Sequence, residues 1–140
     1  MDRQNYHLDE YDVAGAAAIN ESRASHVNAL VDHCYTASLK AGWWKPEDSD
    51  NPYTVACKLA LIHSEISEAM EGDRKNAPDD KLPHRKMIEV ELADALIRIC
   101  DLAGWLDLDL GGAVVEKMAF NAQRQDHKPE ARAADGGKAY

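Results

Sequence analysis

Two short segments of this chain each carry a pair of carboxylates three residues apart. Glu65 and Glu68 lie in the segment EISEAM, and Glu91 and Asp94 lie in the segment ELADAL. Both segments follow one pattern: an acid, an aliphatic residue, a small residue, a second acid, alanine and a long apolar residue. Because residues three apart on a helix share a face, each segment would present two carboxylates side by side.

Four carboxylates gathered beside an apolar core would repel one another, and a bound divalent cation is the simplest reason to keep them there. A site made only of carboxylates suits Mg²⁺, with Mn²⁺ as a substitute, rather than zinc or copper. A single pair of this kind is more often a solvated helix face, and it is the repetition that favours a metal site. The sequence therefore predicts a Mg²⁺ site formed by Glu65, Glu68, Glu91 and Asp94.

A second group of polar residues lies near the carboxyl end of the chain. Lys117, Asn121 and Arg124 are spaced by four and three residues, which places them on one face of a predicted helix. Two cations and an amide in a row can hold phosphate oxygens. A solvated basic stripe is the alternative, but beside a metal held by carboxylates a phosphate-binding row is the better interpretation.

The elements that would position these residues are helices. Apolar residues at helical spacing predict helices over about 19–41, 53–75, 84–105 and 113–125, and no segment has the pattern of a β-hairpin. We therefore expect an all-α chain with a single domain over 1–127 that forms a four-helix bundle. In the second and third helices the residues expected to face the core are Val55, Leu59, Ile62, Ile66, Ala69, Met70, Ile88, Leu92, Ala95, Leu96, Ile99 and Leu102.

The segments outside these helices are expected to be irregular. Residues 1–18 are predicted to form a loose arm or a short helical turn, and Gly42 is predicted to end the first helix. Gly111 and Gly112 are predicted to form a break before the fourth helix. Residues 128–140 are small and polar, which is typical of a disordered tail.

The composition narrows the class of protein. A net charge of -9 over 140 residues argues against a nucleic-acid polymer as partner, although not against a single nucleotide that arrives with its own metal. The chain has no signal-peptide pattern and no apolar stretch long enough to span a membrane. Its three cysteines lack zinc-site spacing and are predicted to be reduced core residues, so a cytoplasmic location is expected.

The runs LALIHSEISEAMEGDRK, EVELADALIRI and EKMAFNAQR together resemble the MazG-like all-α nucleoside triphosphate pyrophosphohydrolases. That superfamily includes dimeric dUTPases, dCTP pyrophosphatases and phosphoribosyl-ATP pyrophosphohydrolases. Its ExxE–spacer–ExxD signature is matched by the two acidic pairs, with residues 69–90 between them. Lys117, Asn121 and Arg124 match its Lys-x-x-x-Asn-x-x-Arg row. The resemblance covers about residues 53–127.

The resemblance implies Mg²⁺-dependent hydrolysis of a nucleoside triphosphate, ribo or deoxy, to the monophosphate and pyrophosphate, in house-cleaning of the nucleotide pool. Either Glu65 or Glu68 would activate the attacking water, and Glu91 and Asp94 would be metal ligands. Lys117 and Arg124 would then bind the phosphates, and Asn121 would bind sugar or phosphate.

Recognition of the base is less constrained by the sequence. Four residues are candidate base contacts, although for each a packed aromatic or a surface histidine is the favoured explanation, because aromatic residues dominate protein cores. They are His26, Trp43, Trp44 and Tyr53. Because family members are dimers or tetramers, a homodimer or homotetramer is expected. Two alternatives stay open: a phosphoribosyl-ATP pyrophosphohydrolase, and a non-catalytic oligomeric module that binds nucleotide or metal.

Overall fold

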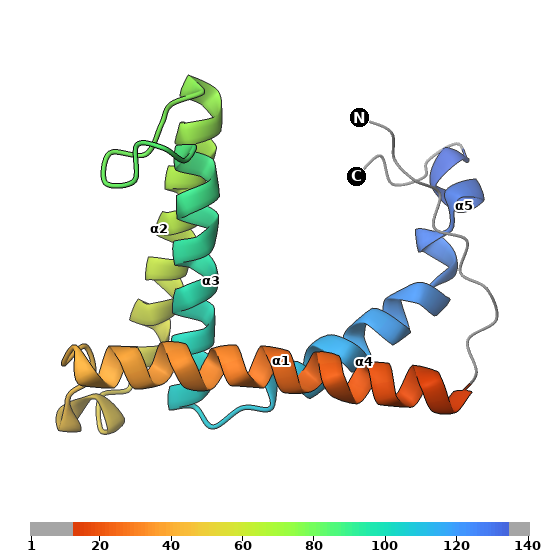
Figure 1. Cartoon of the computed structure of the whole chain (residues 1–140), viewed down its shortest axis with the longest axis horizontal. Helices are drawn as coiled ribbons and strands as arrows, with labels where there is room; N and C mark the ends of the chain where they lie inside the picture. The colour runs from red at the N-terminus through yellow and green to blue at the C-terminus, as the bar shows by residue number, and fades with distance from the viewer. Residues whose placement is uncertain (1–12, 135–140) are drawn as a thin grey trace. The chain divides into compact units, whose positions relative to one another are not determined.

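The computed structural model describes residues 13–134, apart from the side chains of Val13, Ala14 and His127. These residues contain no strand, so the prediction of an all-α chain is confirmed, and each of their helices is too short or too polar to cross a membrane. The elements are α1 (Val13–Lys40), η1 (Pro46–Ser49), α2 (Thr54–Lys75), α3 (Met87–Trp105), α4 (Leu110–Gln123), η2 (Gln125–His127) and α5 (Pro129–Ala133) (Figure 1).

The chain divides into two compact units. One unit, Asn28–Leu110, contains the second half of α1 together with α2 and α3. The other joins Met1–Val27 to Gly111–Tyr140 and contains the first half of α1 with α4 and α5. Both acidic pairs belong to the first unit.

Three segments differ from their predicted conformation. Residues 13–18 belong to α1 rather than to a loose arm, because the alanine run has a high helix propensity; residues 1–12 lie outside the described range. Gly111 and Gly112 lie inside the first turns of α4 rather than in a break before it. Within the stretch 128–140, predicted to be a disordered tail, residues 129–133 form α5, and residues 135–140 lie outside the described range.

The α2 and α3 helices run side by side (Figure 1). Glu65, Ala69 and Gly72 are buried on α2, at spacings of four and three residues that put them on one stripe. On α3 the buried stripe begins with Glu91 and Ala95. Small side chains let two helix backbones approach closely, and the glutamates on the same stripes are therefore carried into the contact.

The connection between the two helices is ordered by its own hydrogen bonds. Asn76 ends α2 in the left-handed conformation, with φ 46°. The buried Asp79 accepts hydrogen bonds at Oδ1 from the backbone N–H groups of Lys81 (3.0 Å) and Leu82 (2.6 Å). The N–H of Met87 donates to the Ala77 carbonyl at 3.0 Å. These bonds set the register in which α2 meets α3.

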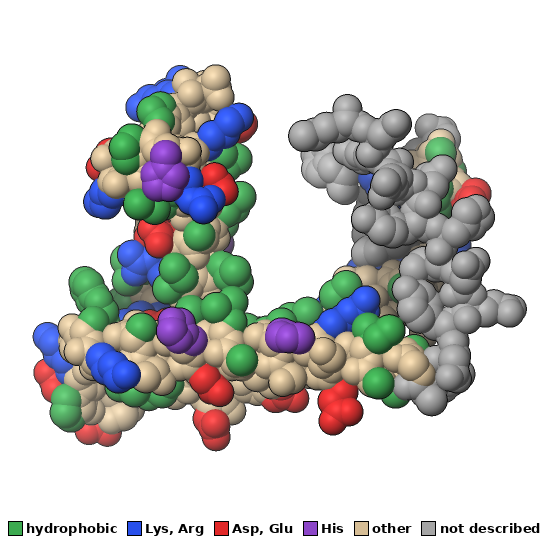
Figure 2. Space-filling model, viewed as in Figure 1, with side chains coloured by type: hydrophobic (Ala, Val, Ile, Leu, Met, Phe, Trp, Pro, Cys, Tyr) green, Lys and Arg blue, Asp and Glu red, His purple; other side chains and the backbone are tan. Residues whose placement is uncertain are grey.

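Of the long apolar residues predicted to face the core of α2 and α3, Leu102 is buried and Val55, Ile62 and Ile88 are half-buried. The six others are exposed, and for them the prediction is wrong. Their exposed fractions run from 38% for Ile99 to 72% for Met70, and Figure 2 shows hydrophobic side chains at the surface of this helix pair. The two helices form one mutual contact, and the stripe of small residues occupies it. The exposed set is Leu59, Ile66, Met70, Leu92, Leu96 and Ile99.

The other end of this unit has a small apolar core between α1 and α3. Gly42, at φ 74°, follows the end of α1 as predicted. The prediction of three buried cysteines is confirmed for two of them and wrong for Cys57, which is exposed. The core is made by Val31 and Cys34 of α1 with Cys100 and Ala103 of α3, and the partly buried Leu110 packs against it.

The close approach of the two helices makes Gly72 intolerant of a side chain. A Cβ at this position would lie 2.8 Å from Met87 Cγ and 2.9 Å from the backbone nitrogen of Ile88. We expect Gly72→Ala to lower the free energy of unfolding by about 1–3 kcal/mol, because the helices must move apart. Urea denaturation measures this.

Gly15→Ala is the matched control, since a Cβ there meets nothing within 4 Å. It should be neutral or stabilise by up to about 1 kcal/mol through helix propensity alone. A Gly72→Ala variant as stable as Gly15→Ala would contradict the close contact.

Candidate metal centre

Three of the four predicted carboxylates meet between α2 and α3. One oxygen each of Glu65, Glu91 and Asp94 lies within 4.8 Å of the others. Glu65 and Glu91 are buried, whereas Asp94 is exposed. Two of the carboxylates are thus held inside the helix contact, and the third is accessible to solvent. We call these three residues the acidic cluster.

The fourth carboxylate, Glu68, lies outside this cluster. It is exposed on α2, one turn beyond Glu65. Its negative charge nevertheless acts on the cluster, because it is one of the causes that raise the pKa of Glu91. Glu68 is therefore near the cluster without being one of its three converging groups.

The carboxylates of the acidic cluster repel one another, and their negative charge is only partly compensated. The pKa of Glu91 is raised from 4.5 to about 7, first by burial and then by the charge of Glu68. A hydrogen bond with Glu65, and the charges of Glu65 and Asp94, raise this pKa further. One cation offsets part of the charge: Arg98 Nε lies 2.8 Å from Glu65 Oε1.

The chemistry of these donors fits Mg²⁺ or Mn²⁺. All three groups offer carboxylate oxygens, which are hard ligands, and no sulfur or imidazole ligand joins them among the described residues. Burial and neighbouring negative charges raise the pKa of Glu91, and a cation at this place would counteract both by favouring its charged form. The cluster could therefore hold one divalent cation through Glu65, Glu91 and Asp94.

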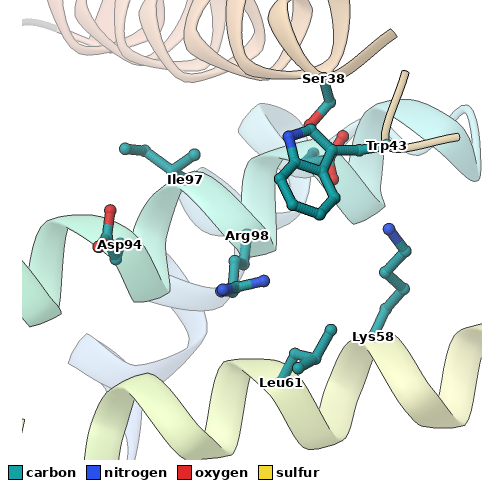
Figure 3. Close-up of a pocket in the computed structure, with 8 residues that line it drawn as sticks. Ser38, Trp43, Lys58, Leu61, Asp94, Ile97 and Arg98 are labelled. Atoms are coloured by element: carbon teal, nitrogen blue, oxygen red, sulfur yellow. The ribbon is translucent and has the colours of Figure 1, made fainter. Parts of the chain in front are cut away.

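A cavity of about 370 Å³ opens next to the acidic cluster, and Asp94 belongs to both (Figure 3). Its size lies within the range typical of small-molecule sites. It combines two cations and an exposed tryptophan with aliphatic walls. The lining residues are Ser38, Trp43, Lys58, Leu61, Asp94, Ile97, Arg98 and Asp101.

Of the four candidate base contacts, only Trp43 lines this cavity. Trp43 is 70% exposed. Trp44 is buried, and its Nε1 donates to Asp101 Oδ1 at 2.7 Å while its ring stacks on Trp105 at 4.7 Å, so it is a core residue. Tyr53 is exposed at the N-cap of α2. The fourth, His26, is exposed on α1 in the other unit.

The predicted phosphate row belongs to the other unit and is only partly helical. Lys117 lies on α4 with its ammonium 4.8 Å from the Phe120 ring centroid. The buried Oδ1 of Asn121 has no hydrogen-bond partner within residues 13–134. Arg124 follows the end of α4 in an extended conformation and forms two bonds to Asp126, at 2.6 and 3.0 Å. The prediction that one helix face carries all three residues is therefore wrong, because α4 ends at Gln123 and Arg124 lies beyond it.

Two basic residues at this site were not singled out from the sequence. Arg98 follows Asp94 by four residues and Glu91 by seven, and Lys58 precedes Glu65 by seven. These are helical spacings, so both cations share a face with the acids. The spacing was a usable signal, but a basic residue seven away from an acid is common on solvated helices as well.

Since burial and neighbouring charges raise the pKa of Glu91 from 4.5 to about 7, the folded protein binds the Glu91 proton more tightly than the unfolded chain does. The wild-type protein should therefore lose stability as pH rises from about 4.5 through 7. Glu91→Gln removes this titration. In EDTA, we expect the stability of Glu91→Gln relative to wild type to increase across that pH range, as measured by urea denaturation.

Glu47→Gln, at an exposed carboxylate of η1, is the control and should keep the wild-type pH profile. Adding Mg²⁺ above pH 7 should stabilise the wild type more than Glu91→Gln. If the stability of Glu91→Gln and of the wild type changed with pH in the same way, the raised pKa of Glu91 would be contradicted.

A scan against protein-family models, a search of curated proteins and a search of solved structures each returned no match to this chain. The resemblance to the MazG-like family therefore rests on the motifs within residues 53–127. The geometry of the acidic cluster and its cavity is the physical observation that bears on function.

Proposed function

We propose that this protein is a Mg²⁺-dependent nucleoside triphosphate pyrophosphohydrolase, acting on nucleotides of the cellular pool. The observation that carries the proposal is the convergence of Glu65, Glu91 and Asp94 within 4.8 Å. They lie beside a cavity whose lining includes two cations, Lys58 and Arg98, together with the carboxylates of Asp94 and Asp101. Burying like charges is costly unless a ligand compensates them, so the arrangement favours a metal-assisted reaction. A phosphate anhydride is the substrate class that brings both metal and negative charge to such a site.

The carboxylates divide into two roles. Glu65, Glu91 and Asp94 would hold the metal, because they converge and two of them are buried. Glu68 is exposed and lies outside the converging set, so its carboxylate remains for proton transfer. We therefore assign the activation of water to Glu68 rather than to Glu65.

The reaction needs little covalent chemistry from the protein. When bound, the cation offsets the charge of the phosphate oxygens and fixes their orientation. Glu68 takes a proton from the attacking water, whose oxygen forms a bond to phosphorus at the anhydride between the α- and β-phosphates. That anhydride bond breaks, and the products are a nucleoside monophosphate and pyrophosphate.

We also propose that the exposed apolar residues of α2 and α3 are covered by a second copy of the chain, which would complete a four-helix core. Leu92 and Leu96 lie four residues apart on α3, and about half of each side chain is exposed. Leu59, Ile66 and Met70 of α2 are exposed as well, so the helix pair carries several long apolar side chains at its surface. A group of exposed apolar residues favours an interface, whereas single exposed residues are ordinary. A homodimer or homotetramer follows, as in the family that the motifs resemble.

The activity is tested by measuring pyrophosphate release from a panel of canonical and modified NTPs and dNTPs, with phosphoribosyl-ATP included, in Mg²⁺ and in EDTA. We expect Mg²⁺-dependent release of equal amounts of pyrophosphate and monophosphate. Glu68→Gln should lower kcat by about a hundredfold or more, because the general base is lost.

Glu47→Gln, at an exposed acid of η1, should keep full activity. Preference for phosphoribosyl-ATP would support that narrower enzyme class. If no substrate in the panel were cleaved by the folded protein, the non-catalytic binding module would replace the enzyme proposal. Unchanged turnover in Glu68→Gln would remove this residue as the base.

Self-association is tested by sedimentation equilibrium at micromolar concentrations. The wild type should have the mass of a dimer or a tetramer of the 15.5 kDa chain. The double variant Leu92→Lys and Leu96→Lys should shift toward 15.5 kDa, because charges placed in an apolar interface are costly. Leu82→Lys, at an exposed residue of the α2–α3 connection, should not change the mass. A monomeric wild type would contradict the proposed interface.

A further inference from the structure

We propose that Lys58 of α2 and Arg98 of α3 bind the phosphate chain of the nucleotide inside the cavity, which Ser38 of α1 and Trp43 also line. This assignment rests on the proposed function and adds to it two residues to which the sequence analysis gave no role. Both residues line the cavity that adjoins Asp94 (Figure 3).

Along both α2 and α3, acidic and basic side chains follow each other at helical spacing. On α3, Glu91 and Asp94 are followed one turn later by Arg98, and on α2, Glu65 is preceded two turns earlier by Lys58. A polyanion held at the acidic cluster through a metal would therefore extend toward both cations. An acid-bound metal followed by two fixed cations matches a chain of phosphates better than it matches a single anion.

Arg98 joins the acidic cluster to the cavity. Its Nε lies 2.8 Å from Glu65 Oε1, and its side chain is 42% exposed although that of Glu65 is only 8% exposed. A guanidinium has five N–H donors in a planar fork, and the contact through Nε uses one side of that fork. The accessible part of Arg98 lies at the cavity, where it can donate to phosphate oxygens while the ion pair fixes its direction.

Lys58 is positioned by an aromatic platform. Its Nζ lies 3.9 Å from the centroid of the Trp44 ring, and that ring is fixed by its stack on Trp105 and its hydrogen bond to Asp101. A cation–π contact orients an ammonium group and leaves its positive charge in place. Lys58 therefore offers a directed positive charge to the cavity that it shares with Arg98.

The competing explanation is that Arg98 serves only as a counter-ion for the buried Glu65. In that case its loss would destabilise the protein, because a buried carboxylate would lose its partner. Lys58 has no such role in the acidic cluster, so the two variants together separate ligand binding from stability.

The test is calorimetric titration of the full chain with inorganic pyrophosphate in saturating Mg²⁺, together with Mn²⁺ affinity in the absence of phosphate. We expect Lys58→Met and Arg98→Met each to weaken pyrophosphate binding by about tenfold or more, which is the typical effect of losing a charge-assisted hydrogen bond. Affinity for Mn²⁺ should stay within about twofold in Lys58→Met. Arg98→Lys, which keeps the charge and protects folding, should recover part of the pyrophosphate affinity.

Lys86→Met is the matched control, since Lys86 is an exposed residue at the N-cap of α3 outside the cavity lining. It should bind pyrophosphate as the wild type does. Wild-type pyrophosphate affinity in a folded Lys58→Met variant, and in Arg98→Met where that variant folds, would overturn the inference while leaving the proposed reaction intact. A wild type that binds Mn²⁺ but not pyrophosphate would overturn it as well, whereas a wild type that binds no metal would overturn the proposed function itself.

Discussion

The contact between α2 and α3 is the constraint on which the rest of this unit depends. Ala69, Gly72 and Ala95 have little or no side chain, so the two backbones come close where these residues lie. Glu65 and Glu91 share the same helical stripes and are buried with them. Their proximity is thus a consequence of helix geometry, and the raised pKa of Glu91 is its electrostatic cost. Strongly perturbed pKa values of this kind cluster at functional sites, which makes this helix contact a candidate site.

The same contact explains the exposed apolar residues. A helix pair has one mutual face, and in this chain small residues and acids occupy it. The long apolar side chains, such as Met70 and Leu92, then lie on other faces of the hairpin. The proposed metal site inside the pair and the proposed association surface outside it would therefore both result from the choice of small residues and acids for the inner stripes.

The tryptophan pair shows how adjacent residues take different roles. Trp44 turns inward, where Trp105 and Asp101 hold it, and its ring supports the ammonium of Lys58. Trp43 remains exposed at the cavity. The buried Trp44 is therefore both a core residue and a support for the cavity, because its ring orients the ammonium of Lys58 beside the candidate metal centre.

The sequence by itself determined the helices and the acidic pairs, because helical periodicity and the spacing of Glu65 with Glu68 and of Glu91 with Asp94 are local properties. It also placed the acids beside an alanine on each helix. Only the tertiary structure decided which three of the four acids converge, because periodicity gives the angle of a residue on its own helix but not the partner that covers it. For the same reason the buried stripe proved to be the small one, and Arg98 was found to be a partner of Glu65.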